Sequence, residues 1–373
     1  MKNNYVSKSR FILATLFLML LSGVSEVKAQ DPIFSQFYNN PIYYNPGYIG
    51  LNAGMRARVN YRDQWTGIPQ AFRTYDLSMD VAERSIPGSG GLGLLFVNDQ
   101  AGTAAIKSTN VGIGTSARIP LYDNMLAQVG FMVSYQQKSI NWDDLVFTDE
   151  LNARYGRIYP TAFETPASNR VSYPDFAVGG VWRFVKTDLT NFNLQGTVGG
   201  AVQHVFQPNE SFLGLSAPLP RKLVFNADLV FEKQQGRSSY RSYRSNGDFK
   251  FNPGFQFEKQ SEFQTFSLGM NVLKSGIYFG AWFRNQSFNF FEAQDAIFTV
   301  GLNAPWGRDS RMKIMYSYDY IINSSLNTAG RASHELSLVF EFDNFSLFSA
   351  GGGGGIHPGY SGGRVREMDC CPF

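Results

Sequence analysis

The chain has 373 residues, of which 15% are aromatic and 17% charged, and it contains 37 glycines. Its formal net charge of +3 at pH 7 is too small an excess to indicate nucleic-acid binding. The only cysteines, Cys370 and Cys371, are adjacent at the end of the chain, which excludes a disulfide-stapled core and makes a metal site there a poor proposition.

Residues 1–29 have the layout of a cleavable secretory signal. Three basic residues in the first ten positions precede an apolar run from Phe11 to Leu21, and Val27-Lys28-Ala29 stands directly before Gln30. That run is too short to cross a bilayer of about 30 Å as a helix, and no cysteine follows to carry a lipid anchor. Removal of the signal leaves 29 basic and 29 acidic side chains, so the mature chain carries no formal net charge.

The next segment, residues 30–50, reads QDPIFSQFYNNPIYYNPGYIG. Its three prolines rule out a regular helix or a central strand throughout, because proline lacks the backbone donor that both need. Its six aromatic side chains are too many to lie free in water. We therefore expect this segment to pack on the structure that follows it.

In residues 51–342, apolar and polar side chains alternate as they do in a sheet that has lipid on one face and a polar environment on the other. In the last strand, Leu336, Leu338 and Phe340 fall on one face, while Ser337 and Glu341 fall on the other. The same pattern predicts fourteen strands, at about 54–62, 73–82, 91–99, 108–120, 124–138, 175–186, 192–206, 222–234, 248–258, 263–273, 276–285, 295–304, 311–321 and 333–342.

These strands predict an all-β fold, a 14-stranded antiparallel transmembrane β-barrel of the outer-membrane type. No apolar run of about 18 residues follows the signal, and only a closed sheet satisfies every backbone group in lipid. A secreted β-sandwich or propeller is the soluble alternative. The expected domains are a signal peptide (1–29), an N-terminal segment (30–50), the barrel (51–342) and a Gly-rich tail (343–373).

The connections between strands alternate in length. Tight turns follow the even strands, and the longest connections, 139–174 and 207–221, follow odd ones; a long basic turn at 235–247 breaks the rule. Long loops of such barrels face outward, so we expect both termini in the periplasm. The N-terminal segment would then pack at the periplasmic mouth and the inner wall through Phe34, Phe37, Tyr38, Tyr43 and Tyr44.

The tail contains five consecutive glycines at 351–355, which indicate a flexible linker. Beyond it, the tail could dock on a periplasmic partner or form an intermolecular disulfide. The residues proposed for this are Arg364, Arg366, Cys370, Cys371 and Phe373. A dispensable extension is the alternative.

Signals of catalysis are weak, and the sequence predicts neither an enzyme nor a cofactor. His204, His334 and His357 belong to no metal or catalytic motif, and no GxSxG elbow is present. The acidic pairs at 143–144 and 149–150 could hold Ca²⁺, but a solvated acidic loop is the favoured interpretation.

Motifs along nearly the whole mature chain resemble the PorP/SprF family of outer-membrane proteins linked to type IX secretion and gliding motility in Bacteroidetes. They are the segment at 30–50, YRDQWTGIP at 61–69, GLGLLFVNDQAG at 91–102, QKSINWDDLVFTDEL at 137–151, QPNESF at 207–212, LPRK at 219–222, GAWFR at 280–284, DAIFTVGL at 295–302, YSYDY at 316–320 and SHELSLVFEF at 333–342. The resemblance implies a monomeric barrel that supports secretion or cell-surface attachment of particular substrates, typically large adhesins with a type B C-terminal sorting domain.

Several of these motifs fall at connections expected on the outer surface, and their composition is that of a protein-docking face. The proposed partner-binding residues are Tyr61, Arg62, Asp63, Gln64, Trp65, Asp99, Gln100, Trp142, Asp143, Asp144, Pro208, Asn209, Glu210 and Phe212. The expected partners are a secreted adhesin, components of the secretion system or other periplasmic proteins, and membrane lipid. A diffusion pore or ligand transporter is the alternative function, because fourteen strands enclose enough room for a channel.

Overall fold

The computed structural model of the protein describes residues 31–67, 72–102, 106–166, 168–189, 192–233, 249–286, 295–307, 310–322, 332–343 and 345–346. The expected signal peptide, the basic turn at 235–247 and the proposed docking residues of the tail lie outside these ranges. Within them, no helix is long and apolar enough to cross a membrane.

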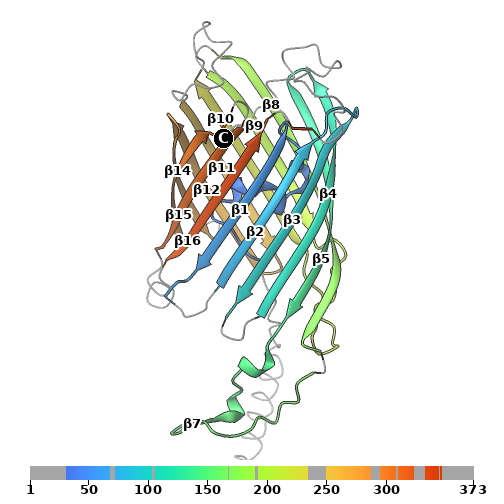
Figure 1. Ribbon diagram of the computed structural model, residues 1–373, viewed down its shortest axis with the longest axis vertical. Helices are drawn as coiled ribbons and strands as arrows, with labels where there is room; N and C mark the ends of the chain where they lie inside the picture. The colour runs from blue at the N-terminus through green and yellow to red at the C-terminus, as the bar shows by residue number, and fades with distance from the viewer. Residues whose placement is uncertain are drawn as a thin grey trace, which may run out of the picture. The chain divides into compact units, whose positions relative to one another are not determined.

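Fourteen strands form one closed antiparallel barrel, which confirms the predicted fold class and strand count (Figure 1). Its strands are β1 (Met55–Gln64), β2 (Phe72–Ala82), β3 (Ser89–Ala101), β4 (Ile106–Tyr122), β5 (Met125–Ser139), β8 (Arg170–Leu189), β9 (Phe192–Gln203), β10 (Lys222–Lys233), β11 (Phe249–Gln260), β12 (Phe263–Lys274), β13 (Ile277–Asn285), β14 (Asp295–Pro305), β15 (Ser310–Ile321) and β16 (Ser333–Phe342). The barrel closes where β1 pairs with β16, from Met55 opposite Phe342 to Asp63 opposite His334. Each of these strands therefore has a partner on both sides, and the wall has no free edge.

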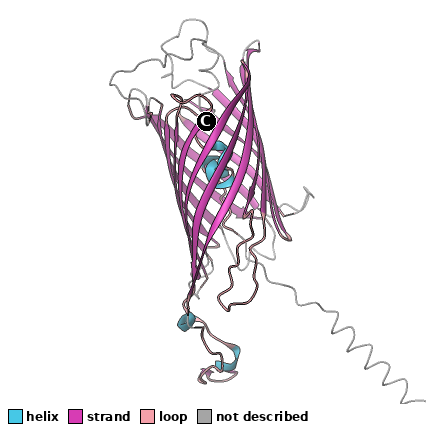
Figure 2. Cartoon of the chain, turned by 90° about the vertical axis from the view of Figure 1, so that its right-hand side faces the viewer, coloured by secondary structure: helices cyan, strands magenta, loops and turns pink. Residues whose placement is uncertain are grey.

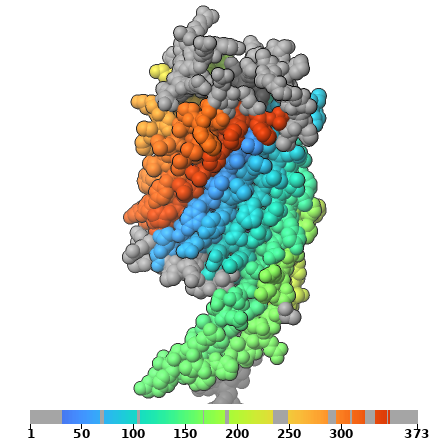
Figure 3. Space-filling view, viewed as in Figure 1, coloured from blue at the N-terminus to red at the C-terminus, as the bar shows by residue number. Residues whose placement is uncertain are grey.

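The wall alternates as the sequence predicts. On β15, Ile314 and Tyr316 are exposed on the outside, whereas Lys313, Ser317 and Asp319 are buried on the inside. Side chains of neighbouring strands cover the visible outer face continuously in the space-filling view (Figure 3). The apolar face suits lipid, and the polar face lines the barrel interior.

The two ends of the barrel differ in their connections. We call the end at which the two-residue turn Asp123-Asn124 joins β4 to β5 the turn end. The opposite end, where residues 140–169 join β5 to β8, is called the loop end, and it lies at the bottom of Figure 1. The long connection carries two 3₁₀ turns, η3 (Trp142–Asp144) and η4 (Thr148–Glu150), and a hairpin of β6 (Leu151–Asn152) and β7 (Gly156–Arg157).

Residues 31–52 lie inside the barrel, and we call them the plug (Figure 2). The plug contains three single turns, η1 (Phe37–Asn39), α2 (Pro41–Tyr44) and η2 (Pro46–Tyr48). A proline begins both α2 and η2, where its missing N–H would have no partner within the turn in any case. The prolines thus confine helical structure to single turns.

The plug runs from one end of the barrel to the other. The backbone N–H of Asp31 donates to Gln260, the last residue of β11 at the loop end, at 3.1 Å. Gly54 accepts a hydrogen bond from the N–H of Ala82, the last residue of β2 at the turn end, at 2.8 Å. Asp31 and Phe342 therefore lie at opposite ends of the barrel. The segment was expected at the periplasmic mouth and the inner wall; it packs along the inner wall and traverses the interior before β1 begins, while both chain termini lie outside the described residues.

Candidate functional site in the barrel interior

Glycines of the wall form a seat for the middle of the plug. An added Cβ at Gly130 of β5 would lie 2.0 Å from the carbonyl oxygen of Pro46. An added Cβ at Gly179 of β8 would lie 2.0 Å from the side-chain oxygen of Asn45, and one at Gly199 of β9 would lie 2.9 Å from its nitrogen. No side chain fits at these inward positions, so the wall admits the plug only because they are glycine.

The outward-facing neighbours of two seat glycines carry no such constraint. An added Cβ would lie 3.8 Å from the Gln128 carbonyl oxygen at Gly180 and 3.9 Å from that of Val224 at Gly200, which are ordinary contacts. Their carbonyl groups nevertheless accept hydrogen bonds from the Asn45 amide, at 3.0 Å and 3.3 Å. Asn45 therefore fixes the plug across β8 and β9 at the point of closest approach.

Polar side chains of the wall satisfy the plug's backbone beyond the seat. The Gln128 amide donates to the carbonyl groups of Gly47 and Ile49, at 2.8 and 2.7 Å, and the Ser116 hydroxyl also donates to Ile49, at 2.6 Å. Farther along, the N–H of Gly50 donates to the Asp80 carboxylate at 2.9 Å. Buried backbone groups need partners of this kind, so the seat is matched chemically as well as sterically.

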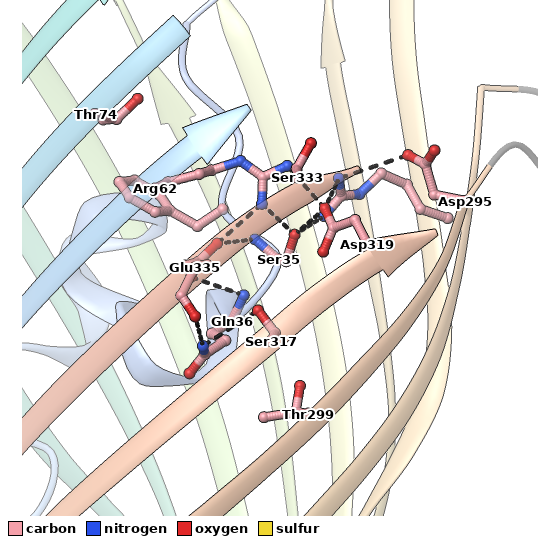
Figure 4. A network of polar contacts seen from close by, with 12 residues as sticks. Ser35, Gln36, Arg62, Thr74, Asp295, Thr299, Ser317, Asp319, Ser333 and Glu335 are labelled. Atoms are coloured by element: carbon pink, nitrogen blue, oxygen red, sulfur yellow. Dashed lines mark hydrogen bonds and ion pairs between the residues drawn. The ribbon is translucent and has the colours of Figure 1, made fainter. Parts of the chain in front are cut away.

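An ionic cluster holds the other half of the plug, and we call it the latch (Figure 4). Arg62 of β1 forms ion pairs with Asp319 of β15 at 2.8 Å and with Glu335 of β16 at 3.0 Å. All three side chains are buried. The Ser35 hydroxyl joins the same cluster, donating to Asp319 at 2.5 Å and accepting from Arg284 of β13 at 2.8 Å.

Glu335 binds the plug's backbone directly. Its two carboxylate oxygens accept the N–H groups of Ser35 and Gln36, at 2.7 Å and 3.0 Å. The Gln36 amide returns a hydrogen bond to the Glu335 carbonyl at 3.1 Å. A buried carboxylate is stable only when it is paired and hydrogen-bonded, and here the wall arginines and the plug together provide those partners.

The beginning of the plug is fixed by an imidazole. His204, the residue after β9, lies with Nε2 2.7 Å from the Asp31 carboxylate and with Nδ1 2.9 Å from the Asp175 carboxylate of β8. No sequence motif predicted a role for His204. Its role depends on Asp31, which is distant in sequence and approaches it only after the plug has entered the barrel.

The five aromatic residues proposed to pack at the mouth and inner wall lie deeper than the mouth. Phe34, Tyr43 and Tyr44 belong to a buried cluster with Ile42 and with wall side chains of β3, β5, β9 and β10. Phe37 and Tyr38 both contact Trp282 of β13, with ring centroids 4.8 and 5.7 Å apart. Aromatic packing along the inner wall thus occupies space that would otherwise hold water.

The proposed partner-binding residues divide into three groups. One group gathers at the loop end, where the Trp142 ring lies 6.2 Å from Phe212 and 5.7 Å from Phe163. Glu210 joins this group through Lys138 at the end of β5. Two connections far apart in sequence, residues 140–169 and 204–221, therefore pack together, and we call their joined surface the loop platform.

The second group forms hydrogen bonds within the connections to which its members belong. Asn209 accepts hydrogen bonds from the N–H groups of Ser211 and Ala217, at 3.2 and 2.9 Å, and Pro208 accepts one from Leu219 at 2.9 Å. Asp144 accepts from Asn141 at 2.7 Å, while Asp143 is exposed beside it. These side chains shape the loop platform.

The acidic residues considered for Ca²⁺ have partners within the chain. Asp149 accepts from the N–H of Ala162 at 2.7 Å, and that hydrogen bond holds the pKa of its carboxyl below the ordinary value. Glu150 pairs with Arg157 at 3.0 Å. Among the described residues, no group of three or more Asp, Glu, His or Cys side chains is arranged to hold a metal ion.

The third group lies along the barrel itself. Tyr61 faces outward, with its ring 5.1 Å from that of Tyr75, and Trp65 packs on Phe72. Half-exposed Asp63, Gln64 and Gln100 lie at the ends of β1 and β3. Asp99 lines an interior cavity beside the plug.

Arg62 requires a correction. Its proposed place on the outer docking face is wrong, because its side chain points inward and only 2% of the residue is exposed. The physical reason is the alternation of β1, which turns every second side chain to the interior, where Asp319 and Glu335 require a cation.

Neither the glycine seat nor the latch was predicted from the sequence. The glycines at 130, 179 and 199 were visible as inward positions of predicted strands, and Asn45-Pro46-Gly47 was visible as a compact turn. Nothing in the sequence indicated that these glycines and this turn are in contact. For the latch, Arg62, Asp319 and Glu335 could be assigned to the lumen by alternation, but their meeting depends on barrel closure between β1 and β16.

These features define a class of protein. A closed barrel with an apolar outer wall, a polar inner wall and a lumen occupied by its own N-terminal segment is a membrane-spanning β-barrel of the outer-membrane type with an internal plug.

The chain belongs to the PorP/SprF family of type IX secretion system membrane proteins, whose family model matches residues 26–340. The protein is thus an outer-membrane component associated with type IX secretion. No curated protein matches the chain.

Solved barrels resemble the chain in fold at low sequence identity. A Pseudomonas aeruginosa FadL homologue shares 13% identity, with 82% of this chain and 94% of that chain covered and a TM-score of 0.39. The Ralstonia pickettii toluene transporter TbuX shares 9% identity over the same shares, with a TM-score of 0.39. The translocator domain of the autotransporter NalP from Neisseria meningitidis shares 11% identity, with 90% and 97% covered and a TM-score of 0.31.

Proposed function

We propose that this protein is a non-catalytic outer-membrane barrel that supports secretion or cell-surface attachment of one type IX secretion substrate. The proposed substrate is a large gliding or adhesion protein with a type B C-terminal sorting domain. Family membership supports the link to secretion. The observation that carries the proposal is the plug, because a barrel filled by its own chain offers its end surfaces to partners rather than an open passage.

The proposed orientation places the loop end outside the cell and the turn end in the periplasm, in keeping with the usual asymmetry of such barrels. The loop platform then forms the docking face for the substrate. It exposes large apolar side chains, among them Tyr155 (67%), Phe206 (73%) and Leu215 (66%). Exposed apolar groups rimmed by charges are typical of protein-interaction surfaces. Secretion components would meet the turn end, and a role for the tail remains a prediction.

A null strain tests this function. We expect it to lose one large surface adhesin, and with it gliding or attachment, while bulk secretion continues. Complementation with a Trp142→Ala/Phe212→Ala variant should restore the barrel but not surface display, because these rings join the two connections of the loop platform. Display is measured by surface labelling of intact cells.

The matched control is Tyr122→Ala, which removes an aromatic side chain that is 72% exposed at the turn end. This variant should restore display fully. General loss of secreted enzymes in the null strain would contradict the proposal and would indicate a core translocon component instead.

A diffusion pore or ligand transporter is the competing function. Fourteen strands enclose enough room for a channel, but here the plug aromatics occupy the interior. We expect the purified protein to give no stable single-channel conductance in planar bilayers. Steady ion currents from the wild-type protein would favour the pore.

A further inference from the structure

A cavity lies between the beginning of the plug and the inner wall near the loop end. Its lining includes Asp31 of the plug, Asp99 of β3 and Asp175 of β8, with apolar side chains of β3 and β5 beneath them. The side chain of Asp31 is 18% exposed, and Asp99 is also partly exposed. The cavity is therefore in contact with solvent.

The cavity carries an excess of negative charge. Three carboxylates line it, and His204 is the only histidine, lysine or arginine among the described lining residues. Lys138 and Lys222 lie near enough to attract Asp31, but each also faces a carboxylate outside the cavity, since Lys138 binds Glu210 and Lys222 lies 2.9 Å from Glu258. Even with His204 protonated, the carboxylates outnumber the cations. Uncompensated charge of one sign favours a ligand of the opposite sign.

Two acceptor atoms of the lining lack a donor. Asp175 is 4% exposed; its Oδ2 lies next to His204, but its Oδ1 has no hydrogen-bond partner among the described residues. The Oδ1 of Asn110 on β4 likewise has none. Buried acceptors without donors are costly, and they are rare in folded proteins. Asp175 and Asn110 both line the same cavity, so a hydrogen-bond donor bound there would satisfy these acceptors.

We propose that this cavity binds an ammonium group. An ammonium supplies three donors and one positive charge and needs no acceptor, which matches an acidic lining with unpartnered oxygens. The apolar floor can receive the first carbons attached to the nitrogen. A compact metal ion is a poorer match, because no set of metal-ligating side chains is arranged for one in the described part of the chain.

The ammonium can come from two sources. Cleavage at the expected site before Gln30 would create an α-ammonium on the residue that directly precedes Asp31 in the chain. Asp31 itself is held in place by His204 and Gln260. In that case, removal of the signal peptide creates the last group that binds the plug to the wall. The other source is an amine from solution, such as a lysine side chain of a partner.

Binding of n-butylammonium to the purified mature protein in detergent distinguishes these sources. Calorimetric titration would use n-butanol and tetramethylammonium as controls, since the first lacks the charge and the second lacks N–H donors. A second preparation has Gln30 cyclised to pyroglutamate before folding, which removes the α-ammonium without adding residues. Binding at least tenfold tighter to the cyclised chain shows that the protein's own amine fills the site. Equal, saturable binding to both chains shows an external source. No preference over the controls in either chain overturns the proposal.

Two substitutions locate the site. Asp175→Asn and Asn110→Leu should each weaken n-butylammonium binding at least tenfold in the chain that binds it, because each changes an unpartnered acceptor. Glu164→Gln is the matched control, since it neutralises an exposed carboxyl of the loop platform outside the cavity. Heat-dependent gel mobility verifies that each barrel is closed. If Asp175→Asn fails to fold, Asn110→Leu still decides. Unchanged affinity in every folded cavity variant rejects the site.

Discussion

Gly130→Ala is expected to displace the plug and to make the barrel conduct ions. Its new Cβ would lie 2.0 Å from the carbonyl oxygen of Pro46 and 2.6 Å from the backbone nitrogen of Gly47. Backbone atoms cannot rotate away as a flexible side chain can, so the plug has to leave its seat. Overpacking of this kind typically costs about 1–3 kcal/mol. The measurements are single-channel conductance and the rate of protease cleavage within residues 31–52 of the folded protein.

The matched control for this prediction is Gly180→Ala on the neighbouring strand. The added methyl group would lie 3.8 Å from the Gln128 carbonyl oxygen, so we expect no channel conductance and a protease-resistant plug. Gly179→Ala should behave like Gly130→Ala, because its Cβ would lie 2.0 Å from the Asn45 side chain. Equal behaviour of the variants at positions 179 and 180 would show that the seat does not hold the plug.

Arg62→Met should destabilise the protein more than any other substitution proposed here. The substitution removes a buried cation and leaves Asp319 and Glu335 without their shared partner, although Arg284 still contacts Asp319 at 3.3 Å. Breaking a buried ion pair from one side typically costs about 3–5 kcal/mol, because the remaining charge is buried without compensation. The check is the thermal transition of the detergent-solubilised barrel, together with protease sensitivity of the plug.

Arg73→Met is the control for the latch. Arg73 has a side chain that is 51% exposed and lies 3.8 Å from Asp63, an exposed pair worth about 0–1 kcal/mol. Adding Glu335→Gln to Arg62→Met should recover part of the lost stability, because it removes one of the two orphaned charges. If Arg62→Met and Arg73→Met shift the transition equally, the latch does not stabilise the protein.

Seat and latch act on the plug through different physics. The seat is steric and backbone-mediated, and it holds the half that includes Asn45 and Pro46. The latch is ionic and holds the half that includes Ser35 and Gln36. Despite this difference, we expect high salt to change the attachment of the plug little in the wild-type protein, because the seat involves no charged groups. The buried latch should also be screened only weakly, because salt acts mainly on exposed charges.

The sequence by itself determined the barrel wall. The strand positions, the strand count and the outward face followed from the alternation of apolar and polar residues. Successive side chains of a strand point to opposite sides, and only apolar side chains are stable against lipid. The interior of the barrel was predictable as a polar face. The need for residues 31–52 to pack on the barrel was also predictable, from six aromatic side chains and three prolines in one short segment.

Only the tertiary structure decided where that segment goes and what holds it. Arg62 and Glu335 are 273 positions apart, and they meet because the barrel closes between β1 and β16. Gly130, Gly179 and Asn45 meet because the plug crosses the interior at their level. Alternation fixes the face of each side chain but not its partner across the lumen, since that partner depends on closure, register and the path of the plug. Local sequence patterns therefore predicted the barrel wall, but they could not predict the site inside it.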